Sequence, residues 1–581
     1  MTTGPDVSVA FASVVVDEWG RAGVTDAVVA PGSRSTPLLV ALAADGRLRI
    51  HVVLDERSAG FVALGFGLAT GRPAPVVTTS GTAAVELHPA IVEADQAAIP
   101  LIAVTADRPP ELHHVGASQT VEQADLYGAS TRWTVIPGVA DLEASGSWRS
   151  LASRTVAAAS GAGSPGGRPG PVHLNVAFRE PLLGAAAELP PGRPGGGPWH
   201  RVTTAAALPA NATVELIASH QGRHGLFVAG AGAGDPPVVA ALADRLGWPV
   251  LADPRSGLRI PAARTVAAAD AVLRVPSVAT LAPDIVVRLG RPWASKVVNQ
   301  WLDALPVSVP QVLVDPHAAW IDPGRQSAHV AGAEPTALAA AVLGALGPSH
   351  PPPSTAGPSW AGRWAELESA AQAAIDTTLA ATDVLSEPAL ARRLLAEVAA
   401  GTVVVCSSSM PVRDVEWWSR SRLGVRVVAN RGANGIDGVV STAIGVALGS
   451  GAPTVALVGD LAFLYDAGAL LWASERSVDL TIVVADNNGG GIFSFLPQAA
   501  AVAPDTFERY WGTPHGLDLT AVAGAYGVAT QRVGDLDELA GALRGGPGIR
   551  LVVVRTDRAA NVAVHARLHV AVATAIGTIE T

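Results

Sequence analysis

The stretch VVADNNGGGIFSFLP, residues 483–497, decides how the rest of the sequence is interpreted. Its first residues are typical of a buried strand. This strand runs into two asparagines and three glycines, which are unfavourable in a core or a strand. A second strand-like run, TVALVGD, ends on Gly459 and Asp460. Between Asp460 and Asn487 lie 26 residues, close to one strand–helix–strand unit of about 30 residues. We therefore expect the two polar strand ends to lie side by side at one edge of a parallel sheet.

Asp460 and Asn487 together indicate a site for a divalent cation. A carboxylate and an amide carbonyl are hard oxygen ligands that suit Mg²⁺, and this ion usually keeps some positions for water or phosphate. The glycines that follow allow the backbone carbonyl of Gly489 to turn toward the same ion and allow a diphosphate to come close. We predict a metal site formed by Asp460, Asn487 and Gly489, with Mg²⁺ as the ion and Mn²⁺ as the alternative. A helix cap followed by a turn is the competing interpretation.

Strand-like apolar runs alternate with helical patterns along most of the chain, which predicts an α/β protein with parallel sheets covered by helices on both faces. Two stretches rich in proline and glycine, residues 188–199 and 347–361, are typical of linkers. They divide the 581 residues into pieces of ordinary domain size. We predict three α/β domains, at residues 1–187, 200–346 and 362–581.

Composition argues against several classes of protein. The net charge is −10 and the basic residues form no cluster, which disfavours nucleic-acid binding. The single cysteine, Cys406, excludes an intramolecular disulfide framework and a zinc finger. The first basic residue is Arg21, which is not typical of a secretory signal. Residues 439–459 are uncharged, but GSGAP divides them into a short helix and a short strand. We expect a cytoplasmic protein without a transmembrane segment.

The Gly-Asp and Asn-Asn pairs at this separation resemble the signature of thiamine-diphosphate enzymes. The resemblance implies pyrimidine-binding, central and diphosphate-binding domains in that order. It also implies a glutamate, here Glu56 in HVVLDERSAGF, that drives the aminopyrimidine ring into its imino form, and an apolar wedge under the cofactor, here Ile436 in NRGANGIDG. Since the cofactor bridges subunits in this superfamily, the chain is expected to form a homodimer at minimum and a homotetramer as the full assembly. A plain salt bridge for Glu56 and a core position for Ile436 are the alternatives.

Further motifs narrow the resemblance. APGSRSTPL, ADRPPEL, GASQT, NRGANGIDG and GDLAFLYD together resemble the 2-succinyl-5-enolpyruvyl-6-hydroxy-3-cyclohexene-1-carboxylate (SEPHCHC) synthase family of menaquinone biosynthesis. The resemblance implies a transferase that decarboxylates 2-oxoglutarate and adds the succinyl carbanion equivalent to isochorismate by 1,4-addition, with release of CO₂.

Both of these substrates are dicarboxylates, so fixed cations and hydrogen-bond donors are expected near the metal. The resemblance assigns substrate contacts to Ser33, Arg34, Arg108, Gln119, Lys296, Ser409, Arg413, Arg431, Phe493 and Leu496. It assigns cofactor contacts to Glu56, Ser409, Ile436, Asp460, Asn487, Ile492 and Phe493, and catalytic roles to Glu56, Arg34, Gln119 and Arg413. Lys296 is the only lysine of the chain, and chance survival on the surface is the alternative to a specific role. Val297 stands where this family often has arginine.

Two other functions compete with this interpretation. The nearer is another thiamine-diphosphate carboligase or 2-oxoacid decarboxylase, similar to acetohydroxyacid synthase, which does not need as many cations. The more distant is a nucleotide-binding or regulatory protein that keeps the folds without catalysis. That protein would be expected to lack Glu56 or the pair of Asp460 and Asn487, and all three residues are present.

Overall fold

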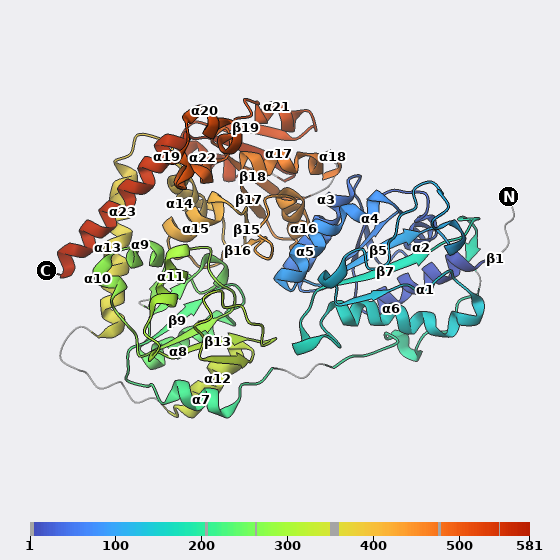
Figure 1. Cartoon of the computed structure of the whole chain (residues 1–581), viewed down its shortest axis with the longest axis horizontal. Coiled ribbons are helices and arrows are strands. Elements are labelled where there is room, and N and C mark those ends of the chain that lie inside the picture. The colour runs from blue at the N-terminus through green and yellow to red at the C-terminus, as the bar shows by residue number, and fades with distance from the viewer. Residues whose placement is uncertain are drawn as a thin grey trace.

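The computed structural model describes residues 5–186, 188–203, 207–261, 264–348, 359–473, 478–544 and 547–580. Within these residues the chain forms three α/β units, each around a six-stranded parallel sheet (Figure 1). Helices cover both faces of each sheet, and β5, β7 and β18 are buried along their whole length. Continuous burial of this kind is typical of strands inside a doubly covered parallel sheet. The predicted fold class is confirmed.

The N-terminal sheet has the order β3-β2-β4-β5-β7-β6. Its strands are β2 (Asp26–Val29), β3 (Arg49–Val52), β4 (Pro75–Thr78), β5 (Leu101–Asp107), β6 (Trp133–Val135) and β7 (Pro171–Ala177). One face packs against α1 (Val7–Arg21), α2 (Thr36–Asp45) and α6 (Ser145–Ala159). The other face packs against α3 (Glu56–Thr70) and α5 (His88–Ala97). A short pair, β1 (Pro5–Asp6) with β8 (Ala185–Ala186), joins the two ends of this unit.

The central sheet has the order β11-β10-β9-β12-β13-β14. Its strands are β9 (Gly225–Ala229), β10 (Val250–Ala252), β11 (Thr265–Val266), β12 (Ile285–Leu289), β13 (Gln311–Asp315) and β14 (His329–Gly332). Helices α7 (Asn211–Ala218), α8 (Pro236–Leu246) and α12 (Pro335–Ala345) cover one face. The other face packs against α9 (Ala269–Leu273), α11 (Lys296–Ala304), α13 (Trp360–Ala380) and α23 (Arg558–Glu580).

The C-terminal sheet has the order β16-β15-β17-β18-β20-β19. Its strands are β15 (Val403–Cys406), β16 (Arg426–Ala429), β17 (Thr454–Gly459), β18 (Leu480–Asp486), β19 (Ala529–Val533) and β20 (Ile549–Arg555). Helices α14 (Glu387–Glu397), α15 (Met410–Trp418) and α22 (Leu536–Leu543) cover one face. Helices α16 (Val439–Ser450), α17 (Asp460–Tyr465) and α21 (Leu519–Gly524) cover the other. Counted within their own units, the strands of both outer sheets follow one order, 2-1-3-4-6-5.

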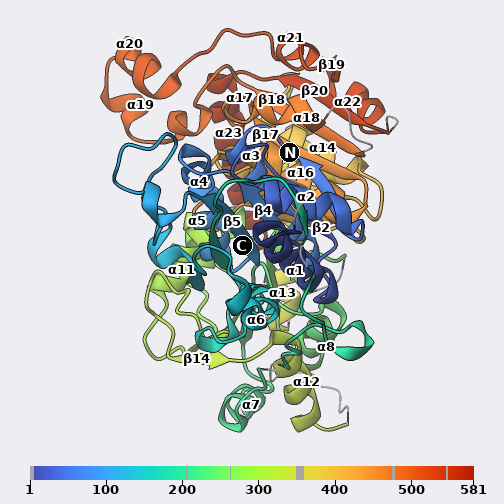
Figure 2. The same cartoon turned by 90° about the vertical axis from the view of Figure 1, so that its right-hand side faces the viewer.

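The two outer units share a hydrophobic core through α3 and α16, which lie side by side in both views (Figures 1 and 2). Glycines face each other at the crossing. A Cβ atom on Gly65 would lie 2.3 Å from the Thr442 carbonyl oxygen, and one on Gly445 would lie 2.1 Å from the Val62 carbonyl oxygen. The backbones therefore approach too closely for any side chain. This contact fixes the start of α3, where Glu56 lies, relative to the C-terminal sheet.

We expect Gly445→Ala to lower the free energy of unfolding by about 1–3 kcal/mol, because the new methyl group overpacks a contact between two helix backbones. Chemical denaturation followed by circular dichroism measures the change. Gly541→Ala is the matched control, since a Cβ atom there meets no atom within 4 Å, and alanine is the better helix former by roughly 1 kcal/mol. Equal stability of Gly445→Ala and the parent protein would contradict the close crossing.

The segments between the three units correspond to the two linkers predicted from the sequence. The first predicted linker, residues 188–199, contains only a single 3₁₀ turn, Pro194–Gly196, among its described residues. Within the second, residues 349–358 lie outside the described residues. The predicted domain boundaries stay predictions. Residues 439–459 form α16 and β17, as expected from GSGAP.

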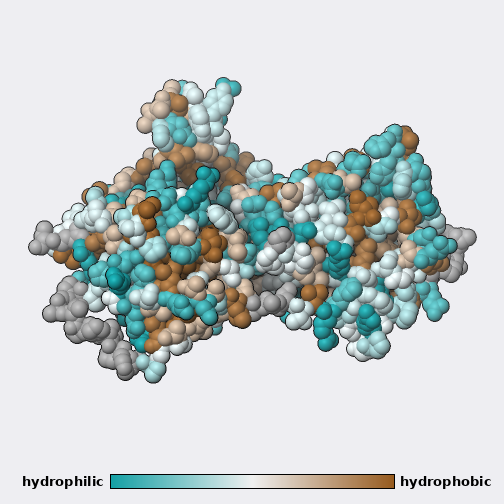
Figure 3. Space-filling model, turned by 60° about the horizontal axis from the view of Figure 1, so that its bottom comes forward, coloured by the Kyte–Doolittle hydropathy of each residue, from teal (hydrophilic) through white to brown (hydrophobic). Residues whose placement is uncertain are grey.

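In the part of the chain that the structure describes, one helix, α23, is long and apolar enough to cross a membrane by length and composition. Its Val564, Leu568, Val572 and Ile576 recur every fourth residue and are fully buried in the cluster shared with α13 and the central sheet. This pattern is typical of a helix packed on a globular unit. On the face drawn in Figure 3, hydrophobic residues lie in small groups between hydrophilic ones.

Candidate functional site

A cavity of about 330 Å³ lies at the carboxyl ends of β15, β17 and β18. In open parallel sheets this edge is where ligands bind. The cavity brings together nine of the residues singled out from the sequence. They are Ser409, Arg413, Arg431, Ile436, Asp460, Asn487, Gly489, Ile492 and Phe493.

Asp460 and Asn487 face the same cavity, as their spacing predicts. Strand β17 ends at Gly459, so Asp460 is the first residue of α17 rather than the last residue of the strand. Its carboxylate accepts the Leu461 N–H (2.7 Å) and the Gly489 N–H (2.8 Å). The Asn487 Oδ1 atom is buried and has no hydrogen-bond partner among the described residues. A buried carbonyl oxygen without a donor, beside a carboxylate, fits a site for a hard cation.

Gly489 shows why this loop needs glycine. Its φ is +139°, and a Cβ atom there would lie 1.9 Å from the carbonyl oxygen of Gly512. The next residue, Gly490, donates its N–H to the same Gly512 oxygen (2.8 Å). The residues around Gly512 thus close over the loop, and any side chain at position 489 would push them away.

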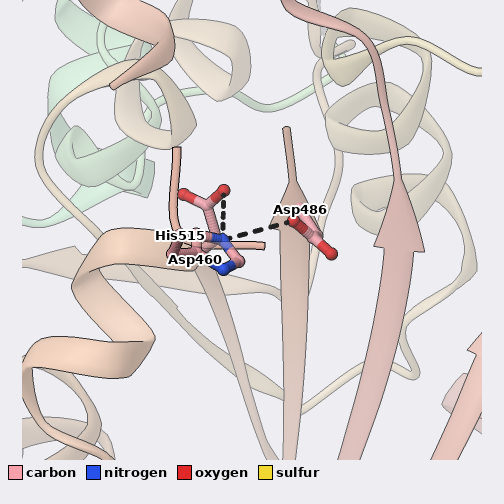
Figure 4. A group of neighbouring side chains, drawn as sticks. All are labelled: Asp460, Asp486 and His515. Atoms are coloured by element: carbon pink, nitrogen blue, oxygen red, sulfur yellow. Dashed lines mark hydrogen bonds and ion pairs between the residues drawn. The ribbon is translucent and has the colours of Figure 1, made fainter. Parts of the chain in front are cut away.

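The sequence did not reveal two other residues at this edge, Asp486 and His515. The His515 Nε2 atom lies 3.3 Å from Asp460 Oδ2 and 3.7 Å from Asp486 Oδ1, so the ring stands beside both carboxylates (Figure 4). Together the three side chains could hold a metal ion. Burial raises the pKa of Asp460, and the charge of Asp486 adds to that rise. Both carboxylates would be stabilised by a cation.

Two arginines on the cavity wall lack carboxylate partners within the described residues. Arg413, in the first turn of α15, donates to the Ser409 carbonyl oxygen (2.5 Å). Burial lowers the pKa of Arg413, and burial together with the charges of Arg255 and Arg413 lowers that of Arg431 to about 10. Half-buried cations that repel one another are a favourable place for an anion. Arg431 also borders a larger cavity, of about 740 Å³, where the three units meet.

The N-terminal sheet gathers a second polar group at its own carboxyl edge. Arg108 donates to the Ser80 Oγ atom (2.7 Å), and the Gln119 side chain donates to the Ser80 carbonyl oxygen (3.0 Å). Arg34 is buried and donates to the Phe178 carbonyl oxygen (3.0 Å) and to Glu180 (3.1 Å). Burial and the charge of Arg34 lower the pKa of Arg108. The two guanidinium groups are therefore close enough to repel each other.

Glu56 lies at the same edge. Strand β3 ends at Val52, and Asp55 is the N-cap of α3, accepting the Ser58 N–H (3.1 Å). Glu56 is thus the first residue of the helix rather than the end of the strand, and it is half-buried. Burial raises the pKa of Glu56, and the nearby charges of Asp55 and Glu86 raise it further. The carboxyl group is suited to holding a proton and donating it in a hydrogen bond.

Comparison with known proteins agrees with this geometry. Residues 10–126 match the family described as thiamine pyrophosphate enzyme, N-terminal TPP binding domain. Residues 196–403 match the middle domain of thiamine pyrophosphate enzymes, and residues 420–554 match their C-terminal TPP binding domain. The chain is 45% identical to the SEPHCHC synthase of Thermobifida fusca, covering 98% of this chain and 99% of that protein. It is 41% identical to the Saccharopolyspora erythraea synthase (97% and 98% covered) and 40% identical to the Chloroflexus aurantiacus synthase (94% and 92% covered).

The chain belongs to the SEPHCHC synthase family.

Membership of the SEPHCHC synthase family confirms the resemblance found in the sequence, and with it a thiamine-pyrophosphate-dependent enzyme of the transferase class. The roles of individual residues stay predictions. Three other predicted contacts are exposed to solvent. Ser33 is exposed, Leu496 is 40% exposed, and Lys296 is exposed at the first residue of α11. Within the described residues none of the three lines the 330 Å³ cavity.

Lys296 nevertheless lies close to the C-terminal unit. The backbone N–H of Ala294, two residues before it, donates to the Glu416 carboxylate (2.9 Å). Glu416 lies on α15, the helix that carries Arg413 in its first turn. The segment around Lys296 is therefore tied to the element that supplies a cavity cation.

Within a single chain, the 330 Å³ cavity is lined from one unit only. All of its described lining residues, from Glu387 to Phe493, belong to the C-terminal unit. Glu56 and the arginine group of the N-terminal sheet are not among them. The single chain thus separates the two halves that the sequence analysis assigns to one site.

Proposed function

We propose that this chain decarboxylates 2-oxoglutarate and adds the resulting succinyl unit to isochorismate, releasing CO₂, as the SEPHCHC synthase of menaquinone biosynthesis. The observation that carries the proposal is a single cavity in which Asp460 lies with the cations Arg413 and Arg431 and with the Asn487 carbonyl, which has no hydrogen-bond partner among the described residues. Similarity to SEPHCHC synthases along nearly the whole chain supports it.

In this proposal the cofactor is held mainly by the C-terminal unit. Asp460, Asn487 and the backbone carbonyl of Gly489 hold Mg²⁺, with Mn²⁺ as the alternative ion. The cofactor itself contacts Ser409, Ile436, Ile492 and Phe493. When bound, thiamine diphosphate supplies the sink for the electron pair left on carbon as CO₂ departs. Ile492 and Phe493 exclude water from one wall, and a dry wall favours a step that disperses charge.

The arginines bind the carboxylates of the two substrates. Arg413 and Arg431 lie in the cofactor cavity, and Arg34 and Arg108 lie at the edge of the N-terminal sheet, with Gln119 as a further donor. A dicarboxylate would relieve the mutual repulsion of each pair. Ser33, Lys296 and Leu496 are assigned to the same substrates as outer contacts.

We propose a homo-oligomer in which the N-terminal edge of one copy closes the cavity of another, as a dimer or a tetramer. The one-sided cavity supports this assembly. So do the exposed apolar side chains beside Glu56, since Leu54 is 55% exposed and Val85 is 42% exposed. A second copy would cover both side chains. We also propose a cytoplasmic location, which suits the buried Cys406 thiol, whose pKa burial raises to about 12.

The purified full-length chain tests the proposed function directly. We expect CO₂ release from 2-oxoglutarate only when thiamine diphosphate and Mg²⁺ are both present. Addition of isochorismate should accelerate release and give one product whose mass equals the two substrates less CO₂. Pyruvate, the substrate expected of the acetohydroxyacid synthase alternative, is the control. Faster turnover of pyruvate than of 2-oxoglutarate, or no turnover of either, would contradict the proposal.

A further inference from the structure

The side chain of Asn487 makes a hydrogen bond at only one of its two ends. Its Nδ2 atom donates to the Glu387 Oε1 atom (2.8 Å), whereas its Oδ1 atom is buried without a partner among the described residues. Glu387 lines the same cavity as Asn487 and lies 100 residues before it in the chain. The amide is therefore anchored by its nitrogen, and its oxygen is left for something that the protein does not supply.

Glu387 is itself fixed by residues from the C-terminal end of the chain. It is the first residue of α14, and its N–H donates to Asn561 Oδ1 in α23 (3.2 Å). The Thr556 hydroxyl donates to the same Oε1 atom (3.3 Å), while the Thr556 N–H donates to the Asp486 carbonyl oxygen (2.9 Å). Glu387 is also nearly inaccessible to solvent. Contacts from α23 and from the end of β20 thus hold its carboxyl group at one place.

The arrangement selects one of two orientations of the amide. A primary amide can turn over and exchange its oxygen and nitrogen at little steric cost. The turned-over amide would bring its oxygen against Glu387 Oε1, which already acts as an acceptor for Thr556 and Asn487. The orientation that points Oδ1 into the cavity is therefore favoured. This orientation of the Asn487 amide is also favoured when the Glu387 carboxyl is neutral with its proton on Oε2, because the Oε1 atom still accepts a hydrogen bond.

We propose that Glu387 is a positioning residue, which fixes the Asn487 amide so that its oxygen faces the metal and diphosphate. This inference rests on the proposed function, because it takes Asn487 as a metal ligand. In this proposal Glu387 acts through Asn487, to which it is hydrogen-bonded, rather than by contact with the metal or the reacting atoms. Groups that orient metal ligands typically contribute 10- to 100-fold to metal affinity.

The test measures metal-dependent cofactor binding rather than turnover. Thiamine diphosphate is held constant, Mg²⁺ is titrated, and binding to the full-length protein is followed by tryptophan fluorescence or calorimetry. We expect Glu387→Ala to raise the half-saturating Mg²⁺ concentration at least tenfold, and Glu387→Gln to change it less than threefold, since an amide oxygen still accepts from Asn487. At saturating Mg²⁺, kcat of Glu387→Ala should recover to within about threefold of the parent value.

The control is Glu368→Ala, which removes a half-buried carboxylate of α13 that accepts the Ala268 N–H (2.9 Å) and does not line the cavity. It should leave the Mg²⁺ requirement unchanged. If Glu387→Ala does not fold, Glu387→Met preserves the length without the acceptor and is expected to raise the requirement similarly. An unchanged requirement in the folded variant would overturn the proposal. So would a loss in Glu387→Gln as large as in Glu387→Ala.

A double-mutant cycle separates this inference from the proposed function. In the Asn487→Ala background, Glu387→Ala should alter the Mg²⁺ requirement less than twofold, because there is no amide left to orient. If the increases in Mg²⁺ requirement of the two single variants multiply in the double variant, the positioning role of Glu387 is overturned, while the proposed metal site still stands. If Asn487→Ala by itself leaves the requirement unchanged, the proposed metal site fails instead.

Discussion

Glu56→Gln should lower the rate of CO₂ release from 2-oxoglutarate by at least 100-fold, with no loss of the folded state. A group that holds or moves a proton in the transition state typically contributes 10²–10⁴-fold. Burial and two neighbouring carboxylates raise the pKa of Glu56, so its carboxyl keeps a proton more readily than an exposed glutamate. Such a group can donate to a ring nitrogen of the cofactor and then take the proton back, whereas a glutamine amide can donate but cannot release its proton.

The local structure predicts that the fold tolerates this change. The N-cap of α3 is Asp55, whose side chain accepts the Ser58 N–H, so this capping hydrogen bond does not depend on Glu56. Asp55→Asn is the matched control, because asparagine is an equally good N-cap, and it should alter the rate less than about fivefold. Thermal unfolding should place all three proteins within a few degrees of one another. Full activity of Glu56→Gln would refute the proton-holding role.

Glu56 also illustrates how far the sequence could lead. Its position after an apolar strand and before a helix was visible in HVVLDERSAGF. The end of β3 at Val52 and the capping role of Asp55 were not, because strand ends and caps depend on local hydrogen bonds that a hydrophobic pattern does not encode. The same displacement occurs at Asp460, which begins α17. In both cases the side chain lies at the predicted edge although the element boundary differs.

Side-chain contacts between segments far apart in the chain could not be predicted from the sequence. Asp460 and Asn487 are joined by one crossover of fixed length, so their placement on one cavity follows from topology alone. Glu387 meets Asn487 across 100 residues, and His515 meets Asp460 across 55. No periodicity or motif connects these pairs, because the contacts arise only when α14 and the segment around Gly512 pack against the strand ends. The one cue was a polar residue at the start of a helix, which is too common to single out Glu387.

Asp460→Asn should abolish metal-dependent cofactor binding and yet leave the cofactor-free protein about as stable as the parent. In the folded chain burial raises the pKa of Asp460 above its value in the unfolded chain. A carboxyl with a raised folded pKa contributes stability below the unfolded pKa and loses it as the pH rises through the folded pKa, so at neutral pH the ionised group is a net cost. Asparagine keeps the shape and removes the charge, but its NH₂ group cannot accept one of the two backbone N–H groups, those of Leu461 and Gly489, that the carboxylate accepts, and this loss offsets part of the gain. A bound cation would stabilise the charged aspartate and so offset the cost of burying it, whereas the neutral asparagine gains no such stabilisation. We therefore expect at least a 100-fold loss of cofactor affinity in the variant.

The thermal midpoint of unfolding, measured with and without thiamine diphosphate and Mg²⁺, reports both the stability of the cofactor-free protein and the binding of the cofactor. A ligand that binds only the folded state raises this midpoint. The parent should gain several degrees on adding both, and Asp460→Asn should gain none.

Two neighbouring variants then locate the ion. If it lies between Asp460 and Asn487, Asn487→Ala should lose the gain, and Asp486→Asn should keep most of it. The opposite pattern would move the ion to the group of Asp460, Asp486 and His515, whose ligand atoms also lie within 4.8 Å of one another. A gain that persists in Asp460→Asn would exclude both placements, since Asp460 is the one residue they share.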